Sequence, residues 1–517
     1  MSNKVPDPLF VLVKTLSKAE KRHFQLSTRN KIRNKEMLYI RLFGMLDKME
    51  VYDETTLIKK IPGIKKSQLP NLKAHLYRQL LSSLRGLYRL KDPVMELREL
   101  FDYARVLYDK GLYPQSKHML GRIKPRAQML EEISLSHEVI EFEKLIESRY
   151  ITPGLESRTA LLSLESRQLS RQLSSISYLS TLSLRMYGLY LKMGHARDEK
   201  DARILKDFLE LHLPAFPDQD LGFYEKTYLY QTYCWYYYTL QDFALYYRYC
   251  RKWVDLFEKL PQQKTADPSL YLKALHNLLT AYFYTRNQER FTSELQIMAQ
   301  FIREKEAGFE ENTRLYAFVY LSTARINKHF LEGTFSEGLN LVAEIENQIR
   351  IYQAKLDDNR VMVFYYKIAC LYFGSGDNGN AIKYLHRIIQ LRVGNLREDI
   401  QCFARILHLI AHFEMENFSL VEYLVKSVYH FIAQHRDQSR VMEEIMLFLR
   451  KNLYARPDEL LNGFRELREQ LLLLSKNPFE KRSFLYLDII SWLESRISGI
   501  PVQTVIRNKF LQGIARF

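Results

Sequence analysis

Apolar residues recur every three or four positions along almost the whole chain, which is the spacing of amphipathic helices. In segment 67–90 this spacing is carried by Leu69, Leu72, Leu76, Leu80, Leu84 and Leu87. No segment alternates apolar and polar residues as a half-buried strand would, and no Asn-Gly turn joins two apolar runs. The pattern therefore predicts an all-α fold class.

The first 91 residues predict four helices. Residues 10–26 and 37–49 are amphipathic, and Asp53 has the position of an N-cap for a short helix that ends at residue 60. Ile61-Pro62-Gly63 separates that helix from the longer helix over 67–90. Asp92-Pro93 ends the module, because a proline disfavours helical backbone in the residue before it.

A recurring turn divides the rest of the chain into helix pairs. It combines a small or polar residue, a second residue that is polar except at Leu112, and an aromatic residue, and it occurs at Gly111, Gln241, Gly333 and Glu416. Gly376 begins a variant without the aromatic residue, and weaker instances lie at Gly194 and near residue 288. From Gly194 onward these turns lie 40 to 47 residues apart, a period typical of an α-solenoid built from antiparallel helix pairs.

Bulky and small residues recur at fixed places around the turns. Before Gly376 stand Tyr365, Ile368, Ala369 and Tyr372, and after it Ala381, Leu385 and Ile388. Similar sets flank Gly111 (Leu100, Tyr103, Ala104, Leu107; Ser116, Leu120, Ile123) and Gln241 (Tyr233, Cys234, Tyr237; Tyr246, Cys250, Trp253). Small residues at such places allow two helices to cross closely.

This arrangement resembles the tetratricopeptide repeat over roughly residues 93–435. The spacing here is longer than the family's period of about 34 residues, and the proline that closes each family repeat is missing. The resemblance implies a right-handed α-solenoid whose inner helices line a concave groove. It also implies that a peptide or a partner helix binds in that groove.

The aromatic-rich segment 224–253 has two interpretations. Its tyrosines and tryptophans either pack as repeat core or serve as binding anchors, since exposed Tyr, Trp and Arg are typical of binding sites. Alignment on Cys234 gives the groove positions that the resemblance implies, namely Tyr228, Gln231, Trp235 and Tyr238, and in other repeats Arg98, Phe101, Arg105, Tyr108 and Tyr366.

Residues from 457 onward predict three further helices, over 458–474, 478–497 and 502–510. A solenoid needs a terminal piece that covers its last apolar face, and this segment is a candidate for that cap. We therefore expect a basic N-terminal module over 1–91, tetratricopeptide-like repeats over 92–455 and capping helices over 456–517.

The net charge of +16 is concentrated at one end of the chain. Residues 1–91 contain 20 Lys and Arg residues against seven acidic residues, a net charge of +13. Three interpretations remain open: a helix-turn-helix, a docking surface for an acidic protein or an RNA backbone, and an ordinary solvated helical face. The candidate polyanion-binding residues are Lys59, Lys60, Lys65, Lys66, Lys73 and Arg78.

Composition narrows the class of protein. Gly (19) and Pro (15) are too scarce for the frequent turns of a sandwich or barrel, and 47% apolar content excludes a disordered chain. The four cysteines have no paired spacing, which favours buried thiols in a reducing compartment. With no signal-peptide core and no membrane-spanning run, we expect a cytoplasmic protein without membrane contact.

No motif predicts catalysis. Gly374–Gly379 spells GxGxxG, but that fingerprint works only between a strand and a helix, so we interpret it as a turn between two helices. His408 and His412 share a helix face, yet Leu409 stands where a zinc protease needs Glu. We therefore predict no enzyme, no metal and no cofactor.

The expected function is a non-catalytic adaptor that binds a peptide or partner helix of another protein on the concave face. The alternative is a nucleic-acid-associated regulator whose N-terminal module contacts DNA or RNA phosphates. The sequence predicts neither the partner nor the oligomeric state.

Overall fold

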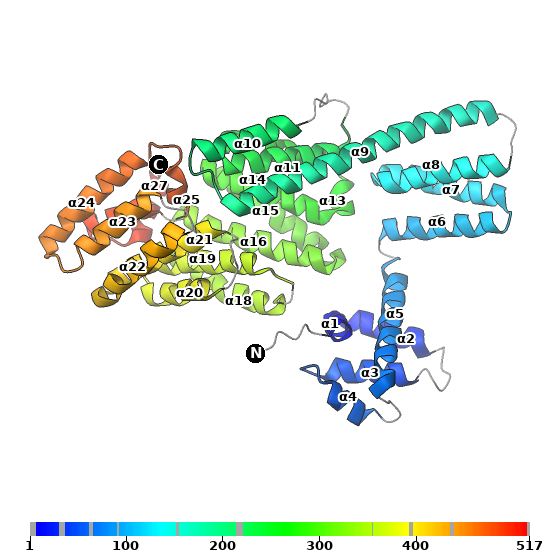
Figure 1. Cartoon of the computed structure of the whole chain (residues 1–517), viewed down its shortest axis with the longest axis horizontal. Helices are drawn as coiled ribbons and strands as arrows, with labels where there is room; N and C mark the ends of the chain where they lie inside the picture. The colour runs from blue at the N-terminus through cyan, green and yellow to red at the C-terminus, as the bar shows by residue number, and fades with distance from the viewer. Residues whose placement is uncertain are drawn as a thin grey trace. The chain divides into compact units, whose positions relative to one another are not determined.

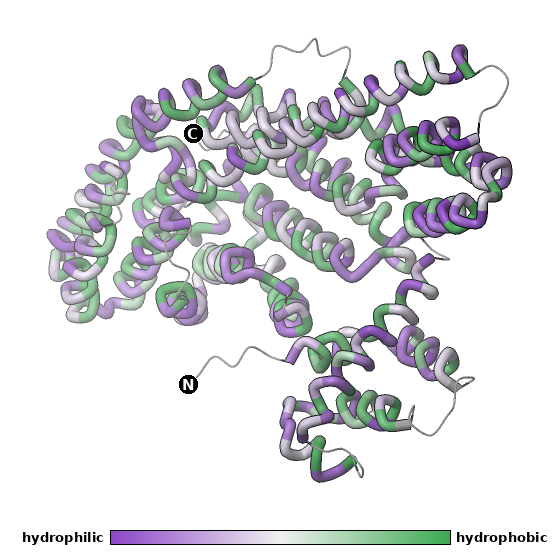
Figure 2. Tube along the Cα trace, turned by 45° about the vertical axis from the view of Figure 1, so that its right-hand side comes forward, coloured by the Kyte–Doolittle hydropathy of each residue, from purple (hydrophilic) through white to green (hydrophobic). Residues whose placement is uncertain are grey.

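The computed structural model describes residues 7–29, 37–61, 66–89, 92–150, 155–213, 221–353, 355–391, 397–434, 439–486 and 488–513. These residues form α-helices, short 3₁₀ turns and connecting loops, without a strand (Figure 1). The prediction of an all-α fold is confirmed for this part of the chain. Each helix carries both hydrophobic and hydrophilic residues along its length (Figure 2), as the amphipathic spacing predicted.

The contacts divide the chain into two units, residues 1–169 and 170–517. The division falls inside one 39-residue helix, α9 (Leu155–Met193). The domain boundaries predicted after residues 91 and 455 lie inside the two units. We describe each unit separately.

Unit 1 begins with a cluster of short helices around α5, which contacts α1, α2 and α3. Leu42, Phe43 and Leu76 are almost fully buried in its core. The predicted cap is confirmed, because the Asp53 side chain accepts from the backbone N–H groups of Thr55 and Thr56. The helices are α1 (Pro8–Thr15), α2 (Lys18–Arg29), α3 (Met37–Lys48), α4 (Glu54–Lys60) and α5 (Leu69–Tyr88), with a 3₁₀ turn at Lys66–Gln68.

The single helix predicted over 10–26 is wrong, because it breaks at Leu16, where the backbone is extended. Ser17 starts a new helix: its side-chain oxygen accepts from Glu20 N–H at 3.3 Å, and Glu20 accepts from Ser17 N–H at 2.6 Å. This is a capping box, S-x-x-E. The sequence contains that signal, but the continuous apolar spacing concealed it.

The rest of unit 1 is an antiparallel stack of α6 (Pro93–Asp109), α7 (Tyr113–Met129) and α8 (Ile133–Arg149), followed by the start of α9 (Figure 1). α6 and α7 cross closely, since Ala104 and Ser116 are fully buried. The Ser116 hydroxyl donates to the Ala104 carbonyl at 2.7 Å. The small residues therefore stand at a helix crossing, as the sequence predicted.

Unit 2 is an array in which each helix packs on its neighbours along the chain. Contacts run from α11 to α12, from α12 to α14, and onward through α16, α19, α20, α21 and α22. The helices of the array are α10 (Glu199–His212), α11 (Phe223–Thr239), α12 (Phe243–Lys259), α13 (Gln263–Ala266), α14 (Pro268–Thr285), α15 (Gln288–Lys305), α16 (Glu311–Glu332), α17 (Phe335–Gly338), α18 (Val342–Ile351), α19 (Asp358–Ser375), α20 (Asn378–Gln390), α21 (Glu398–Glu414) and α22 (Phe418–Gln434).

Left-handed residues end the helices at the predicted turns. Positive φ angles occur at all of these turns, namely at Gly111, Gly194, Gln241, Arg286, Gly333, Gly376 and Glu416. At Gly376 the turn is closed by two hydrogen bonds, from Gly376 N–H to the Phe373 carbonyl and from Asp377 N–H to the Tyr372 carbonyl. This pairing is the Schellman motif, which satisfies the free carbonyls of a helix end. The predicted positions of the turns are confirmed.

The C-terminal helices return to the middle of unit 2. They are α23 (Arg440–Lys451), α24 (Pro457–Leu474), α25 (Lys481–Tyr486), α26 (Ile489–Ser498) and α27 (Val502–Leu511). α24 packs on α23 and α26, while α27 contacts α16 and α19. The Arg507 guanidinium donates to the Glu332 carbonyl at 3.1 Å. The predicted helix over 478–497 is therefore two helices, and Asp488 caps the second by accepting from Ser491 N–H.

Candidate functional site

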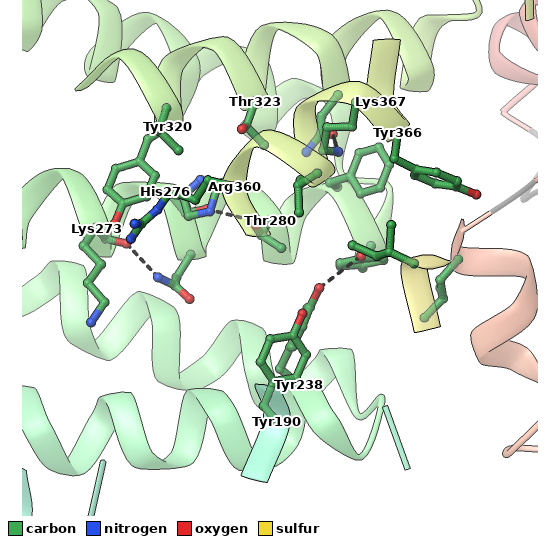
Figure 3. A pocket seen from close by; sticks show the side chains of 18 of the residues that line it. Tyr190, Tyr238, Lys273, His276, Thr280, Tyr320, Thr323, Arg360, Tyr366 and Lys367 are labelled. Atoms are coloured by element: carbon green, nitrogen blue, oxygen red, sulfur yellow. Dashed lines mark hydrogen bonds between the residues drawn. The ribbon is translucent and has the colours of Figure 1, made fainter. Parts of the chain in front are cut away.

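Unit 2 encloses a cavity of about 800 Å³. Its walls come from the end of α9 and from α11, α14, α16, α19 and α21, with α25 and α27 contributing Phe484, Val502 and Ile506. Lys273, His276 and Tyr320 lie on one side of it, and Tyr190 lies beside Tyr238 on another (Figure 3). Its volume is within the range of about 300–1,000 Å³ that is typical of ligand pockets.

Five of the nine predicted groove residues line this cavity: Tyr228, Gln231, Trp235, Tyr238 and Tyr366. The first four lie on α11 at intervals of three or four residues, so they share one face of the helix. Tyr366 occupies the matching inner helix α19. The structure therefore brings residues from two separate helices to one site.

The other four predicted residues lie on α6 in unit 1 and line no part of the cavity. Phe101 is buried, and its ring centroid lies 5.7 Å from that of Phe142. Tyr108 contacts the same ring at 5.3 Å. Arg98 lies 3.9 Å from Glu138, and Arg105 is exposed. Phe101 and Tyr108 therefore pack as repeat core.

Aromatic rings form one wall of the cavity. The centroid of the Trp235 ring lies 4.5 Å from that of Tyr187 and 5.1 Å from that of Tyr190, on which it stacks. The Tyr238 hydroxyl lies 3.2 Å from the Tyr284 hydroxyl. Burial raises the pKa of Tyr190 and Tyr238 well above the ordinary value, so both phenols are neutral. The wall presents flat apolar faces with a few hydroxyl groups.

The aromatic segment 224–253 serves the core and the cavity at once. Tyr233 and Tyr237 stack on Tyr249, with ring centroids at 4.2 and 5.5 Å. Trp253 is fully buried in the core, whereas Trp235 lines the cavity. Residues that pack in the core and residues that line the cavity therefore lie on different faces of α11 and α12.

Two lysines project into the cavity from inner helices. The Lys273 ammonium on α14 donates to the Gln231 side-chain oxygen at 2.9 Å. The Lys367 ammonium on α19 donates to the Asn327 side-chain oxygen at 2.6 Å. Burial lowers the pKa of each lysine to about 8. In each case the ammonium group is hydrogen-bonded to a neutral side-chain amide of the preceding inner helix.

Two arginines that line the cavity, Arg360 and Arg397, differ from these lysines, because each has a carboxylate partner. Arg360 pairs with Asp357 at the start of α19. Arg397 forms hydrogen bonds of 2.8 and 2.9 Å with Asp399. These arginines are therefore already compensated within unit 2.

His276 lies between the charged groups and is neutral. Burial, followed by the nearby Lys367 and Lys273, lowers its pKa to about 3. Its ring stacks on Tyr320 with centroids 4.4 Å apart. His276 can therefore donate or accept a hydrogen bond in the cavity without adding charge.

Sequence reasoning missed Lys273, His276, Arg360 and Lys367. The available signal was a lysine within an otherwise apolar stretch of an inner helix, as at Lys367 before Ile368 and Ala369. Lysine is almost never buried without a partner. A lysine in that place thus indicates either solvent or a cavity.

The predicted polyanion-binding residues lie in or near the first five helices of unit 1. Lys59, Lys60, Lys66 and Arg78 are exposed. Lys73 is part-buried, where it pairs with Asp7 and donates to the Tyr52 hydroxyl at 2.8 Å. Lys65 lies outside the described residues. Four of the six side chains are therefore accessible to a ligand.

Both motifs that imitate functional sites lie on helices of unit 2 or on the turn between them. The GxGxxG segment joins α19 to α20, so its interpretation as a helix–helix turn is confirmed. His408 and His412 are buried on α21 with ring centroids 4.5 Å apart. His412 Nδ1 lies 3.1 Å from the Asn417 amide nitrogen, which fixes its ring.

Comparison with known proteins does not assign a function to this chain. Neither the protein-family models nor the curated proteins give a match to this chain. Among the residues that the structure describes, no helix combines the length and the apolar character needed to cross a membrane. A function for this chain therefore has to be argued from the cavity of unit 2 and the cations of unit 1.

Proposed function

We propose that unit 2 is a non-catalytic binding module that receives a short, extended segment of another protein in its cavity. The observation that carries the proposal is the convergence of predicted groove positions on one cavity, with Trp235 and Tyr238 as aromatic anchors. Anchors of this kind supply large contact area at low entropic cost. The resemblance to tetratricopeptide repeats supports the same function, and we expect the protein to act as an adaptor in the cytoplasm.

The volume favours an extended segment over a partner helix. Three turns of α-helix are about 16 Å long and about 10 Å across, which requires more than about 1,200 Å³. The cavity holds about 800 Å³. A strand-like segment of a few residues fits this space without moving the inner helices.

The test is selection of a displayed library of random octapeptides on the intact protein, compared with a variant whose cavity is filled. Thr323 is a half-buried lining residue on α16, and Thr323→Trp places an indole in the cavity. The matched control, Ser427→Trp, adds the same ring at an exposed position on α22. Thermal melting checks that both variants fold.

We expect the wild type and Ser427→Trp to enrich the same peptides and Thr323→Trp to lose them. Trp235→Ala provides a second variant, which should weaken the selected peptides at least tenfold. Equal enrichment on wild type and Thr323→Trp would place binding outside the cavity. An absence of enriched peptides on the wild type would refute the proposal.

A second candidate function rests on unit 1. Lys59, Lys60, Lys66 and Arg78 are exposed, and none of them forms an ion pair with another described residue. Such a surface suits phosphate groups of DNA or RNA. The intact protein should then bind a labelled 30-nucleotide duplex at 50 mM salt and release it at 200 mM. Replacement of these four residues by Gln should abolish that binding, and no binding at 50 mM salt would exclude this candidate.

A further inference from the structure

The ammonium groups of Lys273 and Lys367 line the cavity without an ion-pair partner among the residues that the structure describes. Their contacts are neutral: Gln231 and Asn327 accept their hydrogen bonds, and the rings of Trp253 and Phe330 lie 5.9 and 5.5 Å away. Neither lysine has a carboxylate within ion-pair distance among the described residues. Buried cations in folded proteins are normally paired.

From this arrangement we infer that the bound segment is acidic and carries two carboxylate side chains, one for Lys273 and one for Lys367. The inference rests on the proposed function and names the class of peptide that the cavity takes. A carboxylate that enters this site forms a charge-assisted hydrogen bond in a medium of low dielectric constant, where such bonds are strong. The carboxylate of the segment also supplies a negative charge beside the lysine ammonium group.

The charges around the cavity agree with an anionic ligand. Five cationic residues line it, namely Lys273, Arg286, Arg360, Lys367 and Arg397, against the two acids Asp267 and Asp488. Asp267 lies at the N-terminus of α14, where it caps the helix by accepting from Leu270 N–H at 3.0 Å. Asp357 and Asp399 are engaged by arginines. Asp267 also attracts Lys273 electrostatically, but no ion pair joins either lysine to an acid of the described chain.

The two lysines also set the spacing of the acids. Lys273 lies on α14 and Lys367 on α19, with α16 between them in the array. Packed helices lie about 8–10 Å apart, and an extended chain advances about 3.3 Å per residue. Because the lysine side chains converge on one cavity, the two acids should be separated by about three to five residues.

Four proteins serve for the test: wild type, Lys273→Met, Lys367→Met and a control, Lys383→Met. Methionine keeps the length of the lysine side chain without its charge, and Lys383 is exposed on the outer helix α20. Each protein selects octapeptides from the same library. The wild type and Lys383→Met should enrich Asp or Glu at two positions, and each cavity variant should lose the preference at one position.

A double-mutant cycle then assigns each acid to its lysine. With the best wild-type peptide, Lys367→Met should weaken binding at least tenfold. Replacing the matching Asp of the peptide by Asn should weaken wild-type binding equally and should have no further effect on Lys367→Met. Additive effects of the two changes would overturn the pairing.

The possible failures are distinguishable. If peptides are selected that depend on Trp235 but carry no acidic preference, the inference is wrong and the proposed function stands. A second outcome is that no peptide is selected, while inorganic pyrophosphate raises the melting temperature of wild type and not of Lys273→Met. The cavity then holds a small anion, and both the inference and the proposed function are wrong.

Discussion

Lys367→Met should make unit 2 more stable. Burial lowers the pKa of this lysine from 10.5 to about 8, a difference of about 2.5, and each pKa unit corresponds to 1.36 kcal/mol. The ammonium group therefore destabilises the folded state by about 3 kcal/mol at pH 7. Loss of the hydrogen bond to Asn327 offsets about 1 kcal/mol. The expected net gain is about 2 kcal/mol.

Tryptophan fluorescence gives a readout for the correct unit. The three tryptophans of the chain, Trp235, Trp253 and Trp492, all belong to unit 2. Urea unfolding followed at this signal therefore reports on the unit that contains Lys367, whatever unit 1 does. Lys383→Met is the control, and as an exposed substitution it should change the unfolding free energy by less than about 0.5 kcal/mol.

The pH dependence gives an independent check with a defined sign. Because the folded state lowers the pKa of Lys367, the unfolded chain binds more protons between pH 8 and 10.5. The stability contributed by this group therefore rises with pH across that window. The advantage of Lys367→Met over wild type should be complete at pH 7 and should shrink as the pH approaches 10.5. A variant that is less stable than wild type at pH 7, or an advantage independent of pH, would refute the reasoning.

Three further predictions follow from the turns and a buried thiol. Gly376→Ala should destabilise unit 2 by about 1–2 kcal/mol, since the φ angle of Gly376 is 92°, in the left-handed region. Gly188→Ala is the control: Gly188 lies inside helix α9 with open space around it, so alanine should stabilise unit 2 by about 0.5–1 kcal/mol. Urea unfolding followed by tryptophan fluorescence measures both changes. Gly333→Ala should cost more than Gly376→Ala in the same assay, because its new Cβ would meet the backbone of α27 at 2.5 Å. The thiol of Cys250 should resist iodoacetamide at pH 8 until urea unfolds the protein, because the side chain is fully buried and burial raises its pKa well above the ordinary value; mass spectrometry of peptides reports the labelling.

Local rules account for what the sequence predicted well. The left-handed residue at each helix end is a local requirement, and Gly111, Gly333 and Gly376 satisfy it without side-chain strain. At Gln241 and Glu416 the same geometry is held by ordinary residues, and there the flanking polar and aromatic residues gave the prediction. Periodicity and turn chemistry were therefore sufficient for the order of the helices in this array.

Breaks within a continuous apolar pattern were harder to predict. The break at Leu16 leaves the three- and four-residue spacing intact on both sides, so only the capping residues mark it. The same holds before α26, where Asp488 caps a new helix. Hydrophobic spacing reports which face is buried, while capping chemistry decides where one helix ends and the next begins.

The cavity was predictable only in part, because its residues come from helices that meet through the fold. The face of α11 with Tyr228, Gln231, Trp235 and Tyr238 was implied by the resemblance to the tetratricopeptide repeat, aligned on Cys234. The contribution of α27 could not be predicted, since this helix returns to α16 and α19 across more than 120 residues of chain. Contacts at such separation have no local sequence signal.

The two lysines show why the chemistry of the cavity differs from that of a packed core. A core position that required only volume would be filled better by methionine or leucine, since a buried ammonium group destabilises the folded state. Gln231 and Asn327 orient the lysines but leave their charge in place. Because proteins often break the rules of stable packing at functional sites, two such lysines in one aromatic cavity favour recognition of a ligand over packing. A structural role would require the opposite result in the unfolding experiment, namely a loss of stability in Lys273→Met and Lys367→Met.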